Sequence, residues 1–229
     1  MGRLAGREES ALKNVRIWFE KDGATRYISH LDLNRCMSRV MQRAKIPLWH
    51  TEGFNPHPFM TFALPLSLGI RGKRESMDIK LEKDISEQEL LSRLNACLPE
   101  GIRVFAVTEP VMKPGKIAYA LYQLNLQADE LDNEGLKQSL QRVLDMPQLT
   151  VLKKSKSGVK EVDIKPQLGA CQLAAAGDCV SIQIVLPAGS SNNINPGLLL
   201  DAFRQYGGLS LNADITRLDI YNEEMKPFQ

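Results

Sequence analysis

The hydrophobic residues of the first half switch between two spacings in a fixed order, and this order limits the possible folds more than any other feature. Residues 15–20 alternate in the period-two pattern of a half-buried strand. Ser29 then caps a helix that continues towards Pro47, and Ser86 opens a capping box for a second helix through about Cys97. Further strands are expected at 62–68, 77–81 and 102–107. The predicted order is β-α-β-β-α-β.

The second half repeats this order with an extra hairpin. Helices are expected over Asn133–Asp145 and from Asn195-Pro196 to Gly207-Gly208. The expected strands lie at 119–126, 149–154, 159–165, 170–175, 179–187 and 209–221.

The predicted fold class is therefore α+β, with two tandem ferredoxin-like units that have antiparallel sheets. A flexible tail of residues 1–12 precedes the units at 13–112 and 116–229, and Lys113-Pro114-Gly115 divides them. In such a unit the first and third strands are central and the second lies at an edge. Pro65, which has no backbone N–H to donate, is expected in that edge strand.

Composition excludes several classes of protein. The net charge is +2, so bulk charge gives no sign of a nucleic-acid or membrane-surface protein. The longest nearly apolar run, 62–70, is too short to span a bilayer, and the start of the chain lacks the apolar core of a signal peptide. We therefore expect a cytoplasmic location without a membrane contact. The cysteines lack close pair spacing, so reduced thiols are expected at Cys36, Cys97, Cys171 and Cys179.

All three histidines fall within one stretch of 28 residues, His30 to His57, with His50 between them. His30 follows a helix cap, where free N–H groups and the helix dipole favour an anion. The flanking prolines of Asn55-Pro56-His57-Pro58 stiffen that loop, and Gly53 lets the backbone turn. We expect His30 and His57 to lie close together in one pocket, although a packed histidine and a stiff connector are the structural alternatives.

Two groups of basic residues are candidate phosphate contacts. Arg35, Arg39 and Arg43 recur every fourth residue on the first helix, near one acid, Asp32. A solvated helix surface would show the same stripe. The second group surrounds the extra hairpin, where lysines also protect a strand edge from aggregation. Its members are Lys153, Lys154, Lys156, Lys160 and Lys165. Trp18, on the expected open face of the first strand, is a candidate for stacking on a base.

The sequence offers no familiar catalytic or cofactor motif. It lacks a P-loop, a GxGxxG fingerprint, an HExxH motif and a GxSxG elbow. A three-histidine metal centre with Asp32 or Glu52 is an alternative, but the histidine spacings of 20 and 7 match no compact ligand motif. No metal and no cofactor are therefore expected.

Several segments together resemble a known family. These are Arg26-Tyr27-Ile28-Ser29-His30-Leu31-Asp32, Arg43-Ala44-Lys45-Ile46-Pro47, Gly53-Phe54-Asn55-Pro56-His57-Pro58, Ala63-Leu64-Pro65-Leu66-Ser67-Leu68-Gly69, Val162-Asp163-Ile164-Lys165-Pro166 and Ile215-Thr216-Arg217. Over residues 14–222 the chain resembles the radical-SAM-linked family of uncharacterised bacterial proteins. The resemblance implies a radical SAM protein as partner and an RNA- or ribosome-related setting. Without a CxxxCxxC motif, the chain is similar to the linked domain alone.

The leading hypothesis is a binding module for structured RNA and a radical SAM partner, without independent catalytic activity. The expected recognition residues are His30, Asp32, Arg35, Arg39, Gly53, Asn55, His57, Lys165 and Arg217. One alternative is a metal-independent endoribonuclease in which His30 and His57 act as acid and base. The other is a structural partner that binds a small molecule or protein and does not contact RNA.

Overall fold

The computed structural model describes residues 12–155, 158–169, 171–190 and 192–229. The expected N-terminal tail, apart from Leu12, and Lys156 of the second basic group lie outside these residues. Within the described ranges no helix combines the length and apolarity needed to cross a bilayer. All four cysteines are free thiols, as the sequence predicted.

The first half begins with a strand and two capped helices follow. The Ser29 side chain accepts a hydrogen bond from the N–H of Asp32, and Ser86 does the same for Glu89. These caps begin the helices where the sequence predicted them, because each satisfies a donor that has no intrahelical partner. The elements are β1 (Lys13–Lys21), α1 (His30–Arg43), β2 (Met60–Phe62), β3 (Arg71–Leu81), α2 (Glu87–Asn95) and β4 (Ile102–Thr108), with a short 3₁₀ helix at Gly23–Tyr27.

The second half contains the other two helices and the extra hairpin. Asn195 caps the last helix, and Gly208 ends it with a left-handed φ of 64°. The elements are β5 (Ile117–Gln127), α3 (Asn133–Leu144), β6 (Thr150–Ser155), β7 (Gly158–Asp163), β8 (Cys171–Ala176), β9 (Cys179–Pro187), α4 (Pro196–Gly207) and β10 (Asn212–Asn222), with 3₁₀ turns at Pro114–Lys116 and Lys165–Gln167.

The halves share one sheet, with the strand order β4-β1-β3-β10-β5-β9-β8 and β2 beside β3. The prediction of a mixed α+β fold with mostly antiparallel pairing is confirmed, whereas the expected separation into two sheets is wrong. β10 joins the halves by pairing in parallel with Arg71 and Gly72 of β3. This is possible because β2 has only three residues and covers β3 over Met77–Ile79. The start of the same edge is left for β10.

The strand expected at 62–68 is also corrected. β2 ends at Phe62, and Pro65 lies in the connection between β2 and β3. We define residues 63–70 as the junction loop. Ala63, Leu66 and Ile70 are buried in the core of the second half. The apolar run that resembles a strand is therefore a loop that packs between the halves.

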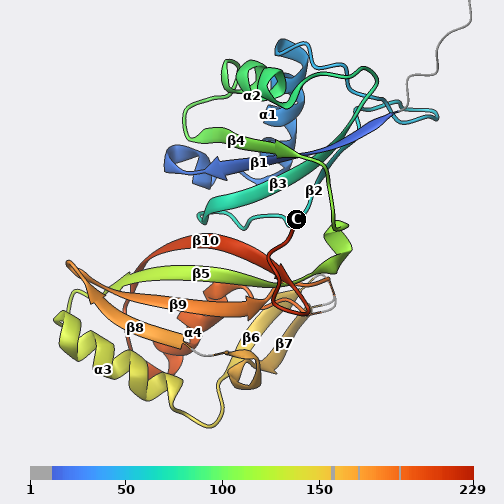
Figure 1. Ribbon diagram of the computed structural model, residues 1–229. Helices are drawn as coiled ribbons and strands as arrows, with labels where there is room; N and C mark the ends of the chain where they lie inside the picture. Colours follow the sequence, from blue (N-terminus) through green and yellow to red (C-terminus); the bar gives the residue numbers. More distant parts are fainter. Residues whose placement is uncertain (1–11, 156–157, 170, 191) are drawn as a thin grey trace, which may run out of the picture.

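Figure 1 shows α1 and α2 on the face of the first-half strands that points away from the second half, and the C-terminal segment between the halves. The face of β1 opposite α1, which the sequence predicts to be open, is covered. Trp18 is only 3% exposed, packs edge-on against Phe228 and donates its indole N–H to Thr108. Trp18 is therefore a core residue and is not available to stack on a base.

Candidate functional site

A buried ion pair lies where β3 meets β10. Arg217 donates from Nε to Oε1 of Glu75 at 2.9 Å and from Nη2 to Oε2. The residues are 2% and 5% exposed, respectively. Arg217 also donates to the backbone carbonyls of Leu64 at 2.7 Å and Pro65 at 3.3 Å. The guanidinium of this one residue of β10 thus forms hydrogen bonds to both β3 and the junction loop.

A bulge in β3 provides the space for this ion pair. Phe19 of β1 faces Glu75, but Lys21 faces Gly72, so β3 has an extra residue at this point. The bulge lets the Glu75 side chain lie over Gly72, where a Cβ would clash with Oε1 of the carboxylate. Position 72 therefore requires glycine because of the close approach of the carboxylate.

A second buried cation, Lys21, lies beside the pair. Its Nζ is 3.5 Å from the carbonyl of Arg26 and 3.3 Å from that of Ile28. Burial lowers the pKa of Lys21, Glu75 raises it and Arg217 lowers it again. Burial alone would also lower the pKa of Arg217, but Glu75 raises it above its usual value. The carboxylate of Glu75 therefore stabilises the charge of both cations.

His30 lies at the edge of this cluster. Its Nδ1 is buried without a hydrogen-bond partner among the described residues, and its ring meets Phe62 edge-on at 5.2 Å between centroids. Burial lowers the pKa of His30, and the charge of Lys21 lowers it further. Both effects favour the neutral form of the His30 ring, which carries no charge to attract a phosphate.

The start of α1 already holds a carboxylate. Asp32 accepts a hydrogen bond from the Ser29 hydroxyl at 2.7 Å and one from Arg35 at 3.2 Å. A carboxylate in the first turn satisfies the electrostatic preference of a helix N-terminus. Asp32 therefore competes with any external anion at the position where the sequence predicted one.

Segments that the sequence analysis singled out meet around the junction loop. The N–H of Gly69 donates to the Arg26 carbonyl at 2.8 Å, and Gly69 has a φ of 83°, which favours glycine. Asn195, the cap of α4, donates to the Ser67 hydroxyl at 2.8 Å. Together with Arg217, these contacts make the loop a structural junction between the halves.

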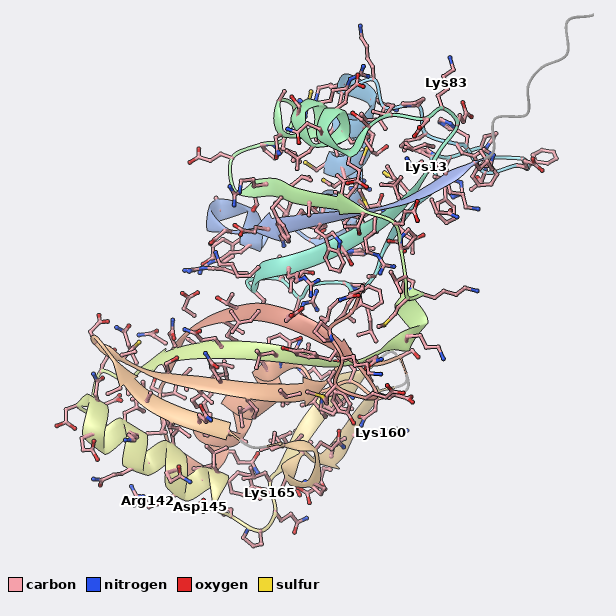
Figure 2. All side chains as sticks on the ribbon, viewed as in Figure 1. Lys13, Lys83, Arg142, Asp145, Lys160 and Lys165 are labelled. Atoms are coloured by element: carbon pink, nitrogen blue, oxygen red, sulfur yellow. The ribbon has the colours of Figure 1, made fainter. Side chains whose placement is uncertain are left out.

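Two residues expected at an RNA surface have structural partners. Arg217 is buried between β3 and the junction loop. Lys165 donates to the carbonyl of Leu144, the last residue of α3, and Figure 2 shows it beside Asp145. A cation at a helix C-terminus satisfies carbonyls that have no intrahelical partner.

Residues 49–59 form a hairpin, which we name the arm. It extends from the end of the first half where β3 reaches Lys80. Its backbone is held by bonds from Thr51 N to His57 O and from Phe59 N to Trp49 O, both 2.9 Å. The N–H of Trp49 donates to Lys80 of β3 at 2.9 Å. Phe54 at the tip is fully exposed, and Gly53 before it has a φ of 128°.

The ring of His57 is oriented by the arm itself. Its Nδ1 lies 3.2 Å from the carbonyl of Asn55 and 3.0 Å from the Thr51 hydroxyl. Because a carbonyl only accepts, Nδ1 carries the proton in the neutral ring and Nε2 keeps a free lone pair. His50 is paired with Pro58 and lies on the other face of the arm. The described residues contain no cluster of three metal-binding side chains.

His30 and His57 share no contact among the described residues. His30 contacts Phe62 and lies near Lys21, at the end of β1 that pairs with Gly72. His57 belongs to the arm, which is attached at Lys80 near the opposite end of β3. The two-histidine acid and base arrangement needed by a nuclease is therefore not supported by the geometry.

The outer face of α1 presents the predicted basic stripe in part. Arg35 and Arg39 are exposed, and Arg35 forms a surface ion pair with Asp32. Arg43 instead donates to the carbonyl of Cys97 at 3.0 Å. Arg39 has no partner in the part of the chain that the structure describes. Two arginines of the stripe are therefore accessible to a ligand.

Sequence reasoning missed Lys21, Glu75, Tyr122 and Phe54. Lys21 and Glu75 occupy ordinary polar positions in strands, so their burial depends on the bulge and on β10. Tyr122 lies beside Arg217, and burial raises its pKa. Phe54 carried a usable signal, because it stands between a glycine and an Asn-Pro pair in the arm.

The environment of His30 leads to a titration prediction. NMR titration of its imidazole should give a pKa below the ordinary 6.5, mainly because burial penalises the charged ring. The corresponding contribution to stability is present above 6.5 and is lost as the pH falls towards the folded-state pKa. Replacing Lys21 with methionine should raise the His30 pKa. A value at or above 6.5 in the wild type would contradict this assignment.

Fold and site together define a mixed α+β protein whose halves are joined by a buried ion pair and whose first half carries a protruding arm. Residues 14–196 match the family DUF2344, described as an uncharacterized protein conserved in bacteria. The chain belongs to this family. No curated protein matches it.

Two solved structures are similar over most of their length. One is an unknown protein from Galdieria sulphuraria, with 11% identity and a TM-score of 0.26, over 89% of this chain and 98% of the other. The second is a putative glycine cleavage system transcriptional repressor, with 12% identity and a TM-score of 0.24. The match covers 91% of this chain and 99% of the other. Both TM-scores are too low to support an argument about this chain.

Proposed function

We propose that the chain is an RNA-binding module that uses the arm and the outer face of α1. The observation that carries the proposal is Phe54, a fully exposed aromatic ring at the tip of a hydrogen-bonded hairpin. Aromatic side chains stack on unpaired bases, typically with about 1–3 kcal/mol per base. A single-stranded loop or bulge is the RNA feature that this tip fits.

The neighbours of Phe54 suit the same ligand. Asn55 is exposed and offers an amide to a base edge, and His57 presents Nε2 as an acceptor. Arg35 and Arg39 on α1 provide phosphate contacts, since the surface ion pair of Arg35 with Asp32 contributes little and is easily exchanged. Base contacts would come from the arm and backbone contacts from α1.

The wider proposal follows the resemblance of the sequence. We propose that the chain acts in the cytoplasm with a radical SAM protein. We also interpret residues 13–112 and 116–229 as two ferredoxin-like units. The pairing orders β4-β1-β3-β2 and β10-β5-β9-β8 support this interpretation, with β6 and β7 as an insertion.

The RNA proposal predicts separate effects for base and phosphate contacts. RNA recovered by cross-linking the tagged protein in its own cells provides the probe for fluorescence anisotropy. Phe54→Ala should weaken binding by about 1–3 kcal/mol at every salt concentration. Arg35→Ala with Arg39→Ala should reduce the salt slope by about one unit for each lost phosphate contact.

Matched controls exist on β4, where Phe105 and Arg103 are also exposed. Phe105→Ala and Arg103→Ala should bind RNA like the wild type. Equal binding by the arm variant and the Phe105 variant would remove the arm from the RNA surface. Recovery of a protein without RNA would favour the alternative of a partner-binding module.

A further inference from the structure

The β6–β7 hairpin forms a small sheet of its own, and one edge of it borders a cleft. The cleft has a volume of about 410 Å³. Leu152, Lys153 and Lys154 of β6 line one side. Asn193, which precedes α4, and Leu198 and Asp201 in its first two turns line the other. This cleft is separate from the arm and from α1, so the proposed RNA surface does not account for it.

The hydrogen bonds of Thr150 show which backbone groups face this cleft. The Tyr206 hydroxyl accepts from the N–H of Thr150 at 3.1 Å and donates to its carbonyl at 3.0 Å. Both groups of Thr150 therefore point away from β7. In an antiparallel pair this direction recurs at every second residue, so the N–H and C=O groups of Leu152 and Lys154 also point away from β7. No hydrogen bond in the described part of the chain uses them.

The face of the hairpin that carries Lys153 is basic, whereas Glu161 lies opposite Leu152 on the other face. Lys153 donates from Nζ to the carbonyl of Asn193 across the cleft at 2.7 Å. Lys153 lies directly opposite Lys160 in the hairpin, and like charges in this position destabilise a sheet. Figure 2 shows Lys160 on the hairpin side of the second half. The one acid that lines the cleft, Asp201, forms an ion pair with Arg204 at 3.1 Å. Lys154 is exposed and has no partner among the described residues.

We propose that this cleft binds an extended segment of a partner protein that alternates acidic and apolar residues and pairs with β6 as an added strand. The free N–H and C=O groups of Leu152 and Lys154 alternate as donors and acceptors, which a peptide backbone matches. On one face of the segment, acidic side chains lie beside Lys153 and Lys160. On the other face, its apolar side chains pack against Leu152, which is 58% exposed.

Other occupants match these features less well. A second copy of the hairpin would bring two lysine-rich edges together, which like-charge repulsion opposes. A nucleic acid would use the lysines, but its phosphates would leave the backbone carbonyls of the edge without donors. The combination of free carbonyls and lysines therefore favours an acidic peptide strand.

A fluorescein-labelled heptapeptide of alternating glutamate and valine tests the proposal by anisotropy with the full chain. It should bind, and a lysine-valine heptapeptide should not. Of two forms with N-methyl groups on alternate residues, one should lose binding and the other should retain it, because only one set of N–H groups faces β6.

Leu152→Pro removes an edge donor and leaves the pairing with β7 intact, because proline is tolerated where the N–H faces outwards. This variant should bind the glutamate-valine peptide about tenfold more weakly than Leu152→Ala, which keeps the N–H. Circular dichroism and urea unfolding show whether both variants are folded. Lys160→Gln, which removes a charge from the basic face and leaves the strand intact, should also weaken binding of the glutamate-valine peptide. The proposal is overturned if the wild type binds neither peptide, if it binds both equally, or if the chain self-associates through this edge.

Discussion

Replacing Arg217 with methionine is expected to lower the free energy of unfolding by about 3–5 kcal/mol, because Glu75 is left as a buried charge without its partner. The junction loop also loses the hydrogen bonds to the carbonyls of Leu64 and Pro65. Urea unfolding followed by circular dichroism measures the effect. Arg35→Met is the matched control, since it removes an exposed arginine and should change stability by less than about 1 kcal/mol.

The double variant Glu75→Met with Arg217→Met removes both charges of the pair. It therefore shows how much of the loss in stability comes from leaving Glu75 unpaired. Replacing both partners of a buried ion pair by apolar residues is often nearly neutral. In this protein the double variant should still be less stable than the wild type, because the Glu75 carboxylate also stabilises the charge of Lys21. A single Arg217→Met variant within about 1 kcal/mol of the wild type would show that the junction is not held by this pair.

Replacing Phe228 with alanine is expected to cost about 3–5 kcal/mol, the usual range for a buried phenylalanine. The ring is 0% exposed and packs against Trp18, and the Arg16 guanidinium lies 4.1 Å from its centroid. Phe228→Leu fills most of the same space and should cost less. The free energy of unfolding of the three proteins gives the comparison.

Tryptophan fluorescence reports the same change locally. In a Trp49→Phe background, Trp18 is the only tryptophan, since the chain has two. Loss of the Phe228 ring should expose Trp18 to water and shift its emission to longer wavelength. Unchanged emission together with unchanged stability would show that the C-terminal segment does not hold the halves together.

The sequence determined the local structure of this protein. Ser29, Ser86 and Asn195 each satisfy an unpaired N–H at a helix start, and this depends only on neighbouring residues. The alternation of residues 15–20 predicted β1, and the stiff Asn-Pro-His-Pro segment predicted a presented loop, which is now seen as the arm. The basic stripe of α1 was predictable because helical spacing is set by the chain itself.

Contacts between distant parts of the chain determine which polar residues are buried and which predicted site residues are accessible. The shortness of β2 leaves an edge of β3 to β10, and this pairing encloses Arg217 and Glu75. Trp18 is buried in the core of the second half. The carbonyl of Leu144 at the end of α3 accepts a hydrogen bond from Lys165. His30 packs against Phe62, whereas the ring of His57 is held by Thr51 and Asn55 of the arm, so the two histidines have different surroundings. These outcomes depend on contacts between residues far apart in the chain, which spacing and periodicity along the sequence do not specify.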